Sequence, residues 1–285
     1  MALLSLLTAV KSGAPKPTHV IPSQRRDHVT AMASLGNEVF ILRLECQQQV
    51  KVFDASTSLQ RNITVPGLGS WSLGLAACAH CKCLYVSDFY NSSIHRAQLS
   101  GSSAVKKWSV ASSPAGLSVN KKHNVVVACF WAHKIQEYTT HGALLREISL
   151  QQAGVRSPLV TTLVTGDYVV SEWKSPGAVS VVGMNGQVVR RYCPSPSSDV
   201  GEMEYPTSLV VTKNHNILVA DVCNSRILLV NNSLSFARKL TLSVVDDGIG
   251  LKLPCGLCLD ESRGRLYVGE VGGSHRELVF YGVGL

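Results

Sequence analysis

Residues 208–233 read SLVVTKNHNILVADVCNSRILLVNNS, in which short apolar runs alternate with polar turns. Apolar runs rich in Val, Ile and Leu, with Asn, Asp, Ser and Lys between them, are typical of antiparallel strands joined by tight turns. Similar stretches occur at residues 74–101, 116–142 and 256–282. The chain therefore consists of a repeated unit rather than of unrelated segments.

Two columns of residues set the register of the repeat. The first lies in the opening apolar run of each unit, at steps of 43, 42, 46, 46 and 48 residues: Met32, Leu75, Leu117, Leu163, Leu209 and Leu257. The second ends the next apolar run: Arg43, Asp88, Cys129, Glu172, Asp221 and Glu270. Four short strands in each unit of about 45 residues are typical of propeller blades. We therefore expect an all-β fold, a six-bladed β-propeller of four-stranded antiparallel blades.

The last unit is too short to supply its own fourth strand, because little chain follows residues 278–281. Residues Thr18–Ile21 form an apolar run ahead of the first unit, and we expect this N-terminal strand to complete the last blade and close the ring. Ring closure would remove an open sheet edge. This predicts an N-terminal tail at residues 1–17 and one propeller domain at residues 18–285.

The net charge of +8 suggests a nucleic-acid partner, but the position of the basic residues weakens that interpretation. Many of them fall in predicted fourth strands, the outer edges of the blades, where Lys and Arg discourage pairing between molecules. They are Arg61, Lys106, Lys107, Arg146, Arg190, Arg191, Arg238 and Lys239.

The nine cysteines form no regularly spaced framework, which favours a reducing, cytoplasmic location. Secretion is the alternative if the apolar residues 2–10 act as a signal peptide, although no basic residue precedes them. No apolar run approaches the ~18 residues of a membrane span, so we expect no membrane association.

Cysteine and histidine gather in the first turn of the second unit, at Cys78, His80, Cys81 and Cys83. These side chains have the chemistry of zinc ligands, but strand alternation would point them to opposite faces and no second ligand pair is nearby. Free thiols that fill small spaces are the favoured interpretation, with a Cys78–Cys83 disulfide as an alternative in a secreted chain.

Four of the six residues in the second column are acids, which supports two interpretations. Each carboxylate can accept hydrogen bonds from backbone N–H groups of an adjacent turn, or several can bind calcium at the propeller axis. Arg43 and Cys129 interrupt the column, so we favour the structural role.

Aromatic residues follow this column in three units, and the turns that carry them should emerge on one face. Clustered aromatic residues with positive charge mark interaction surfaces, although packing between blades would also explain them. The candidate partner-binding residues are Phe89, Tyr90, Phe130, Trp131, His133, Trp173 and Lys174.

Residues 217–221 with Asn224, Arg226 and Ile227 resemble the core of NHL-repeat propellers, and residues 84–88 with Asn91 and Ile94 add to the resemblance. In the third unit Cys129 replaces the Asp, and His133 lies near the Asn position. The resemblance implies a six-bladed ring that binds protein or RNA, often beside RING and B-box domains, neither of which is present in this sequence.

Gluconolactonase-like hydrolases are the enzymatic alternative. The corresponding turns, residues 114–116, 206–208 and 254–256, lack the Asn and Asp ligands that this family would imply. Motifs of serine hydrolases, P-loop proteins, dinucleotide-binding proteins and zinc proteases are also missing from the sequence.

We therefore expect a non-catalytic module without a cofactor, either a monomer or part of a larger multidomain assembly, that binds a protein partner through the aromatic face. Single-stranded RNA stacked on the same aromatic residues is the alternative ligand.

Overall fold

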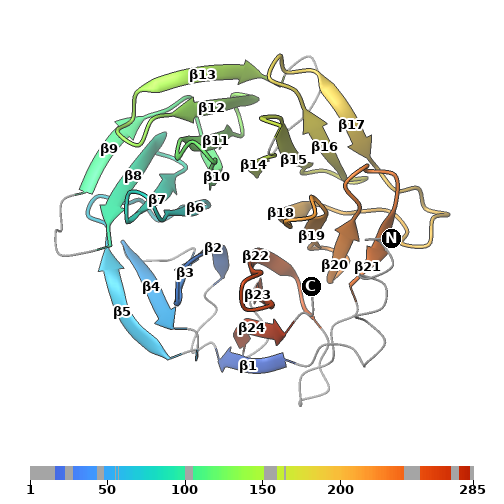
Figure 1. The fold of residues 1–285 in the computed structure, drawn as a ribbon, viewed down its shortest axis with the longest axis horizontal. Coiled ribbons are helices and arrows are strands. Elements are labelled where there is room, and N and C mark those ends of the chain that lie inside the picture. The colour runs from blue at the N-terminus through green and yellow to red at the C-terminus, as the bar shows by residue number, and fades with distance from the viewer. Residues whose placement is uncertain are drawn as a thin grey trace.

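The computed structural model describes residues 17–22, 28–43, 48–54, 56, 58–99, 105–150, 159–163, 165–240, 251–270 and 276–282. Every regular element in these ranges is a β-strand, and the strands form four-stranded antiparallel sheets arranged around a central axis (Figure 1). The all-β class and the propeller of four-stranded antiparallel blades are confirmed. Within these ranges, no helix has the length and hydropathy needed to span a membrane. The candidate signal segment at residues 2–10 lies outside the described residues.

The first three blades follow one another along the chain, each with its strands in sequence order. Blade one contains β2 (Val29–Leu35), β3 (Glu38–Arg43), β4 (Gln49–Asp54) and β5 (Leu59–Thr64). Blade two contains β6 (Leu75–Cys78), β7 (Cys83–Asp88), β8 (Ser93–Gln98) and β9 (Val105–Ser109). Blade three contains β10 (Pro114–Val119), β11 (Val125–Cys129), β12 (Lys134–Tyr138) and β13 (Leu144–Ser149).

The remaining sheets follow the same plan, except for the outermost strand of the last one. Blade four contains β14 (Val160–Thr162), β15 (Tyr168–Glu172), β16 (Ala178–Val182) and β17 (Val188–Tyr192). Blade five contains β18 (Pro206–Val211), β19 (Ile217–Asp221), β20 (Arg226–Val230) and β21 (Ala237–Lys239). Blade six contains β22 (Pro254–Asp260), β23 (Arg265–Glu270), β24 (Arg276–Gly282) and β1 (Pro17–Pro22), which includes Thr18–Ile21 and pairs antiparallel with β24.

The first strands of the blades lie around the axis, and each contacts the first strand of the blade on either side: β2, β6, β10, β14, β18 and β22. They surround a cavity of about 310 Å³, whose described lining combines small residues such as Ala76, Ser118 and Thr161 with Met, Leu and Val. Gly74 shows how closely neighbouring blades approach, since a Cβ built there would lie 2.1 Å from the carbonyl oxygen of Ala115. A larger residue at position 74 would push two blades apart.

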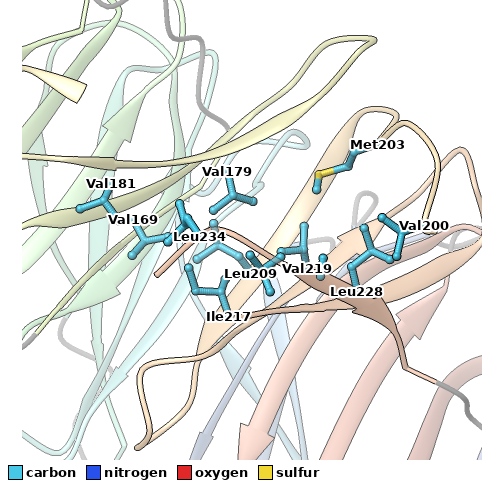
Figure 2. Packing of buried hydrophobic residues seen from close by; sticks show 12 residues of the cluster. Val169, Val179, Val181, Val200, Met203, Leu209, Ile217, Val219, Leu228 and Leu234 are labelled. Atoms are coloured by element: carbon cyan, nitrogen blue, oxygen red, sulfur yellow. The ribbon is translucent and has the colours of Figure 1, made fainter. Parts of the chain in front are cut away.

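The hydrophobic cores lie between adjacent blades. Val169 and Val179 of blade four face Ile217 and Val219 of blade five, and all four side chains are buried (Figure 2). Burying a side chain of this size stabilises the fold by about 1.5–3 kcal/mol. The runs of β-branched residues therefore both favour strand formation and fill the space between adjacent sheets.

One member of the first column is wrong. In blades two, three, five and six, each residue of the first column pairs with a residue of the second strand. This partner lies two residues before the member of the second column, as Val86, the partner of Leu75, lies two residues before Asp88. In blade four this place belongs to Val160, which pairs with Val170, whereas Leu163 follows the end of β14. The register in blade four is therefore three residues earlier than the leucine spacing predicts.

The predicted edge positions of the basic residues are confirmed. The fourth strands of blades one to five carry the basic residues expected there: Arg61, Lys106, Lys107, Arg146, Arg190, Arg191, Arg238 and Lys239. These strands lie on the outside of the ring in Figure 1. Much of the positive charge is thus spread around the rim rather than gathered on one face.

Candidate functional site

The candidate face is built where the second strand of each blade ends. Strands β3, β7, β11, β15, β19 and β23 end at the six residues of the second column. The turn that follows, and the loop that enters the first strand of the same blade, emerge on the same face because strands in an antiparallel sheet alternate in direction. We call this side the column face.

The aspartates of blades two and five join these two segments. Asp88 accepts hydrogen bonds from the backbone N of Gly69, at 3.0 Å, and from Nδ2 of Asn91, at 2.9 Å. Asp221 accepts equivalent hydrogen bonds from the backbone N of Glu204, at 2.7 Å, and from Nδ2 of Asn224, at 3.0 Å. Each carboxylate is buried and fastens the entering loop to the end of the second strand.

The acid of blade six has a related role. The backbone N of Lys252 donates to Oε1 of Glu270 at 2.7 Å, so this carboxylate also holds an entering loop. These contacts agree with the structural role predicted for the column. None of the column acids lines the cavity on the axis, where a calcium site had been the alternative.

Blade three replaces the acid with a different pair of residues. Cys129 occupies the column position and is buried, and burial raises the pKa of its thiol to about 12. Oε1 of Gln136, on the next strand, accepts the hydrogen bond from the entering loop, from the backbone N of Ala111 at 2.8 Å. Tyr138 also donates to this oxygen, at 2.8 Å. In blade three, the neutral amide of Gln136 thus binds the entering loop, as the carboxylates of Asp88 and Asp221 do in their blades.

The Asn position of blade three is held by Ala132 rather than by His133. His133 has a φ of 49° and corresponds to Ser92 and Ser225, whose φ values are 47° and 49°. His133 thus lies next to the Asn position, as the sequence predicted. The side chain of His133 is half-buried, so it contributes less to the surface than expected.

Among the described residues, the acid of blade four holds side chains. Nε and Nη2 of Arg191 donate to Glu172 at 2.7 and 2.8 Å, and the hydroxyl of Ser180 donates at 2.6 Å. Nζ of Lys174 lies 3.0 Å from the same carboxylate. Burial alone would raise the pKa of Glu172, but hydrogen bonds from Arg191, Ser180 and Lys174 outweigh it and lower the pKa to about 2. The charge of Lys174 is therefore compensated.

The predicted aromatic residues divide into buried and exposed ones. Phe89 and Phe130 are buried and pack with Ala115 in one cluster. Tyr90 packs edge-on against Phe89, with ring centroids 5.4 Å apart, and is 67% exposed. Trp131 packs edge-on against Phe130, with ring centroids 4.9 Å apart, and is 55% exposed. Packing between blades therefore explains Phe89 and Phe130, whereas Tyr90 and Trp131 are exposed and stay candidates for a binding surface.

Trp173 extends the surface toward blade five. Its ring packs edge-on against Phe130, with centroids 5.7 Å apart, and remains 43% exposed. The sequence prediction missed two further rings, Trp71 and Tyr205, on the loops that enter blades two and five. Trp71 packs on Tyr90 at 5.6 Å, and Tyr205 packs on Trp173 at 5.4 Å.

A positional signal could have revealed the two missed rings. Each lies four residues before a member of the first column, Trp71 before Leu75 and Tyr205 before Leu209. With them, the surface spans four blades, and we call it the aromatic arc: Trp71, Phe89, Tyr90, Phe130, Trp131, Trp173 and Tyr205.

The cysteine cluster lies on the opposite face. Cys78 and Cys83 pair across the β6–β7 hairpin, and both are buried free thiols, while Cys81 is half-buried and also free. His80 is exposed and stacks on His123 of blade three. Across the described ranges, no three His, Cys, Asp or Glu side chains are placed to hold one metal ion.

The comparisons with known proteins agree with the architecture. The model of the NHL repeat matches residues 203–228, which include the end of the loop entering blade five, β18, β19 and the turn that follows Asp221. No curated protein matches the chain by sequence.

Solved structures share the fold at low identity. A streptogramin B lyase is 12% identical with a TM-score of 0.64, over 92% of this chain and 96% of that one. A catalytically inactive virginiamycin B lyase from Staphylococcus aureus with Quinupristin is also 12% identical with a TM-score of 0.64, over 94% and 88%. Hydrazine synthase from Kuenenia stuttgartiensis is 13% identical with a TM-score of 0.61, over 92% and 94%. The chain is therefore a β-propeller that carries an NHL repeat in its fifth blade.

Proposed function

We propose that this propeller is a non-catalytic interaction module and that it binds a protein partner through the aromatic arc. The observation that carries the proposal is the set of five exposed rings, Trp71, Tyr90, Trp131, Trp173 and Tyr205, held edge-on by one another or by the buried Phe89 and Phe130. Tyr and Trp are enriched among the residues that dominate binding energy, and rigid rings lose little conformational freedom on binding.

The charges beside the arc favour a partner with basic side chains among its apolar ones. Lys174 and Arg191 are already paired with Glu172. At the Tyr205 end, Glu202 and Glu204 are half-buried and form no ion pair with a described residue. Ring faces attract Arg and Lys, and two carboxylates nearby strengthen that preference.

The same charges make RNA the weaker candidate. Binding of single-stranded nucleic acid combines stacking with a positive groove along the backbone, and here the cations nearest the rings are compensated. The lyases named above support the propeller fold only, because they are 12% identical to this chain.

The test is affinity capture with the intact protein and with a Trp131→Ala/Trp173→Ala double variant. A Leu144→Ala/Leu145→Ala variant is the matched control, because both leucines are 53% exposed and lie on the outer strand β13. Loss of a central aromatic pair should weaken binding by about 30-fold or more, as a loss of about 2 kcal/mol implies.

Two further arms make the outcome specific. A Glu202→Lys/Glu204→Lys variant should weaken capture of a basic partner, and nuclease treatment should leave capture unchanged. Equal recovery by wild type and the tryptophan variant would contradict the proposal. Capture that disappears with nuclease and falls steeply with added salt would replace the protein partner with RNA.

A further inference from the structure

A second concave site lies between blades two and three, on the face opposite the aromatic arc. It has a volume of about 390 Å³. Blade two contributes His80 and Cys81 of the β6–β7 turn and Arg96 of β8. Blade three contributes residues 122–124 of the β10–β11 turn and residues 139–141 of the β12–β13 turn. We call it the inter-blade pocket.

The described lining of this pocket is basic. It contains Arg96, Lys122, His80, His123 and His141, and no Asp or Glu. Glu137 is bonded to the β10–β11 turn but does not line the pocket. Its carboxylate accepts hydrogen bonds from the side chains of Asn120, Asn124 and Tyr168. Neither Arg96 nor Lys122 forms an ion pair within the described part of the chain. A concave surface of one charge sign concentrates ions of the opposite sign.

Several of these groups are held in place before any ligand binds. Oδ1 of Asn120 accepts from the backbone N of Lys122 and of Asn124, both at 3.0 Å, which fixes the turn that carries Lys122 and His123. The rings of His80 and His123 stack in parallel, with centroids 4.3 Å apart and planes 9° apart. Nδ1 of His141 lies 3.0 Å from the hydroxyl of Thr140.

Arg96 lines the pocket, and its side chain interacts with that of Cys83. Its Nε is shielded from solvent and has no hydrogen-bond partner in the described part of the chain. A guanidinium group presents several N–H donors in a fork that matches the oxygens of a phosphate group. An oxyanion would therefore find a planar donor together with ammonium and imidazole groups.

A metal ion fits this pocket poorly. The lone pairs of imidazole lie in the ring plane, so two stacked rings do not direct them toward one point between the rings. Arg96 and Lys122 would also repel a cation. We propose that the inter-blade pocket binds the phosphoryl group of a small ligand, with Arg96 and Lys122 as the charged contacts and the histidines as further donors.

A comparable pocket between blades four and five provides the internal control. It is about 270 Å³ in volume and is formed by equivalent turns, with His215 at the place of His123. Its lining has one Arg and one His among the apolar residues Leu163, Val181, Ile217 and Leu234. These two pockets therefore share an architecture, and the lining of one is strongly basic while that of the other is not.

The experiment measures thermal stability and phosphorus NMR of the intact protein with inorganic phosphate, compared with chloride at equal ionic strength. Phosphate should raise the Tm of wild type, because a ligand that binds only the folded state stabilises it. Lys122→Gln/His123→Gln and, separately, Arg96→Gln should each weaken phosphate binding at least tenfold. Arg190→Gln/His215→Gln in the control pocket should leave it unchanged.

Phenyl phosphate in place of inorganic phosphate distinguishes the source of the group. Tighter binding of phenyl phosphate supports a phosphate monoester as the ligand, and tighter binding of inorganic phosphate supports the free anion. The proposal is overturned if phosphate and chloride give wild type the same Tm, or if folded Lys122→Gln/His123→Gln protein binds phosphate as tightly as wild type. Lys122 and His123 are exposed, so this variant keeps the test valid even if Arg96→Gln fails to fold.

Discussion

Asp221 of blade five and Glu172 of blade four end the second strands of neighbouring blades, yet their carboxylates accept hydrogen bonds from different kinds of donor. Asp221 fastens the entering loop of its own blade through the backbone N of Glu204 and also pairs with Nε of Arg226 at 2.6 Å. Glu172 holds Arg191, Ser180 and Lys174. Among the described residues, the arrangement at Glu172 therefore departs from the one at Asp221, which lies in the segment that matches the NHL repeat.

The departure changes what the turn can present. In blade four the backbone of the turn is bonded to the next blade, since the backbone N of Tyr205 donates to the carbonyl oxygen of Lys174 at 3.0 Å. Trp173 and Tyr205 thereby come into contact on the surface. In blade five the equivalent turn, residues 222–225, carries no aromatic ring. Blade two, whose Asp88 holds its entering loop as Asp221 does, also contributes Phe89 and Tyr90 to the arc, so the rings carried by a turn decide what it presents.

The largest effect expected is on stability in blade five. Asp221→Ala leaves Arg226, which is 13% exposed, without its carboxylate, and should lower the free energy of unfolding by about 3–5 kcal/mol. Asp88→Ala removes an equivalent carboxylate whose ion-pair neighbour among the described residues is His95, at 3.5 Å, rather than an Arg, and should cost about 1–3 kcal/mol. Urea denaturation of both variants measures the difference.

A second change checks the cause. Adding Arg226→Leu to Asp221→Ala should recover part of the lost stability, because no unpaired charge then remains buried. Equal losses for Asp221→Ala and Asp88→Ala would show that the ion pair does not distinguish the two blades.

The second largest effect is expected on the stability of the protein at low pH, through Glu172 of blade four. The pKa of Glu172 is about 2 in the folded protein, below its ordinary value of 4.5, so its contribution is complete above pH 4.5 and is lost as the pH falls toward 2. The contribution should be about 2–3 kcal/mol, allowing for the partial exposure of Arg191. Urea denaturation of wild type and Glu172→Gln between pH 2 and 7 measures it.

Subtracting one curve from the other removes the titration of all other carboxyl groups. The stability advantage of wild type over Glu172→Gln should be largest near neutral pH and should shrink below pH 4.5. An advantage that is independent of pH would mean that Glu172 is not held ionised by Arg191.

The smallest effect is expected on the surface. Trp173→Ala should lower the free energy of unfolding by about 1 kcal/mol, because the half-exposed ring loses only its edge-on contacts with Phe130 and Tyr205. A thermal melt of this variant beside wild type checks the value. A loss above about 3 kcal/mol would make Trp173 part of the core, and impaired capture by its variants would then reflect misfolding.

The strand positions could be predicted because they follow from a repeated pattern of burial. The exception, Leu163, shows the limit of spacing. The even steps of 46 residues on either side of Leu163 made it look regular, but the register belongs to Val160. Loops between blades vary in length without disturbing the strands, so spacing alone does not locate a strand of three residues.

The candidate surface was harder to predict because its contacts cross strands and blades. Glu172 and Arg191 are 19 residues apart, and no local pattern reveals that Arg191 turns back to the column face. The interaction of Trp173 with Tyr205 depends on a loop of the next blade. Single rings could be identified from the sequence, whereas their contacts and the compensation of Lys174 required the structure.

The pairing of β1 with β24 also has a consequence for timing. Residues 17–22 are synthesised more than 230 residues before 254–282, which supply the rest of their sheet. At a ribosome speed of roughly 5–20 residues per second, β1 waits roughly 12–50 seconds for its partner. An unpaired strand exposes free N–H and C=O groups to other nascent chains during that interval. We therefore expect the sheet that pairs β1 with β24 to be completed last during synthesis.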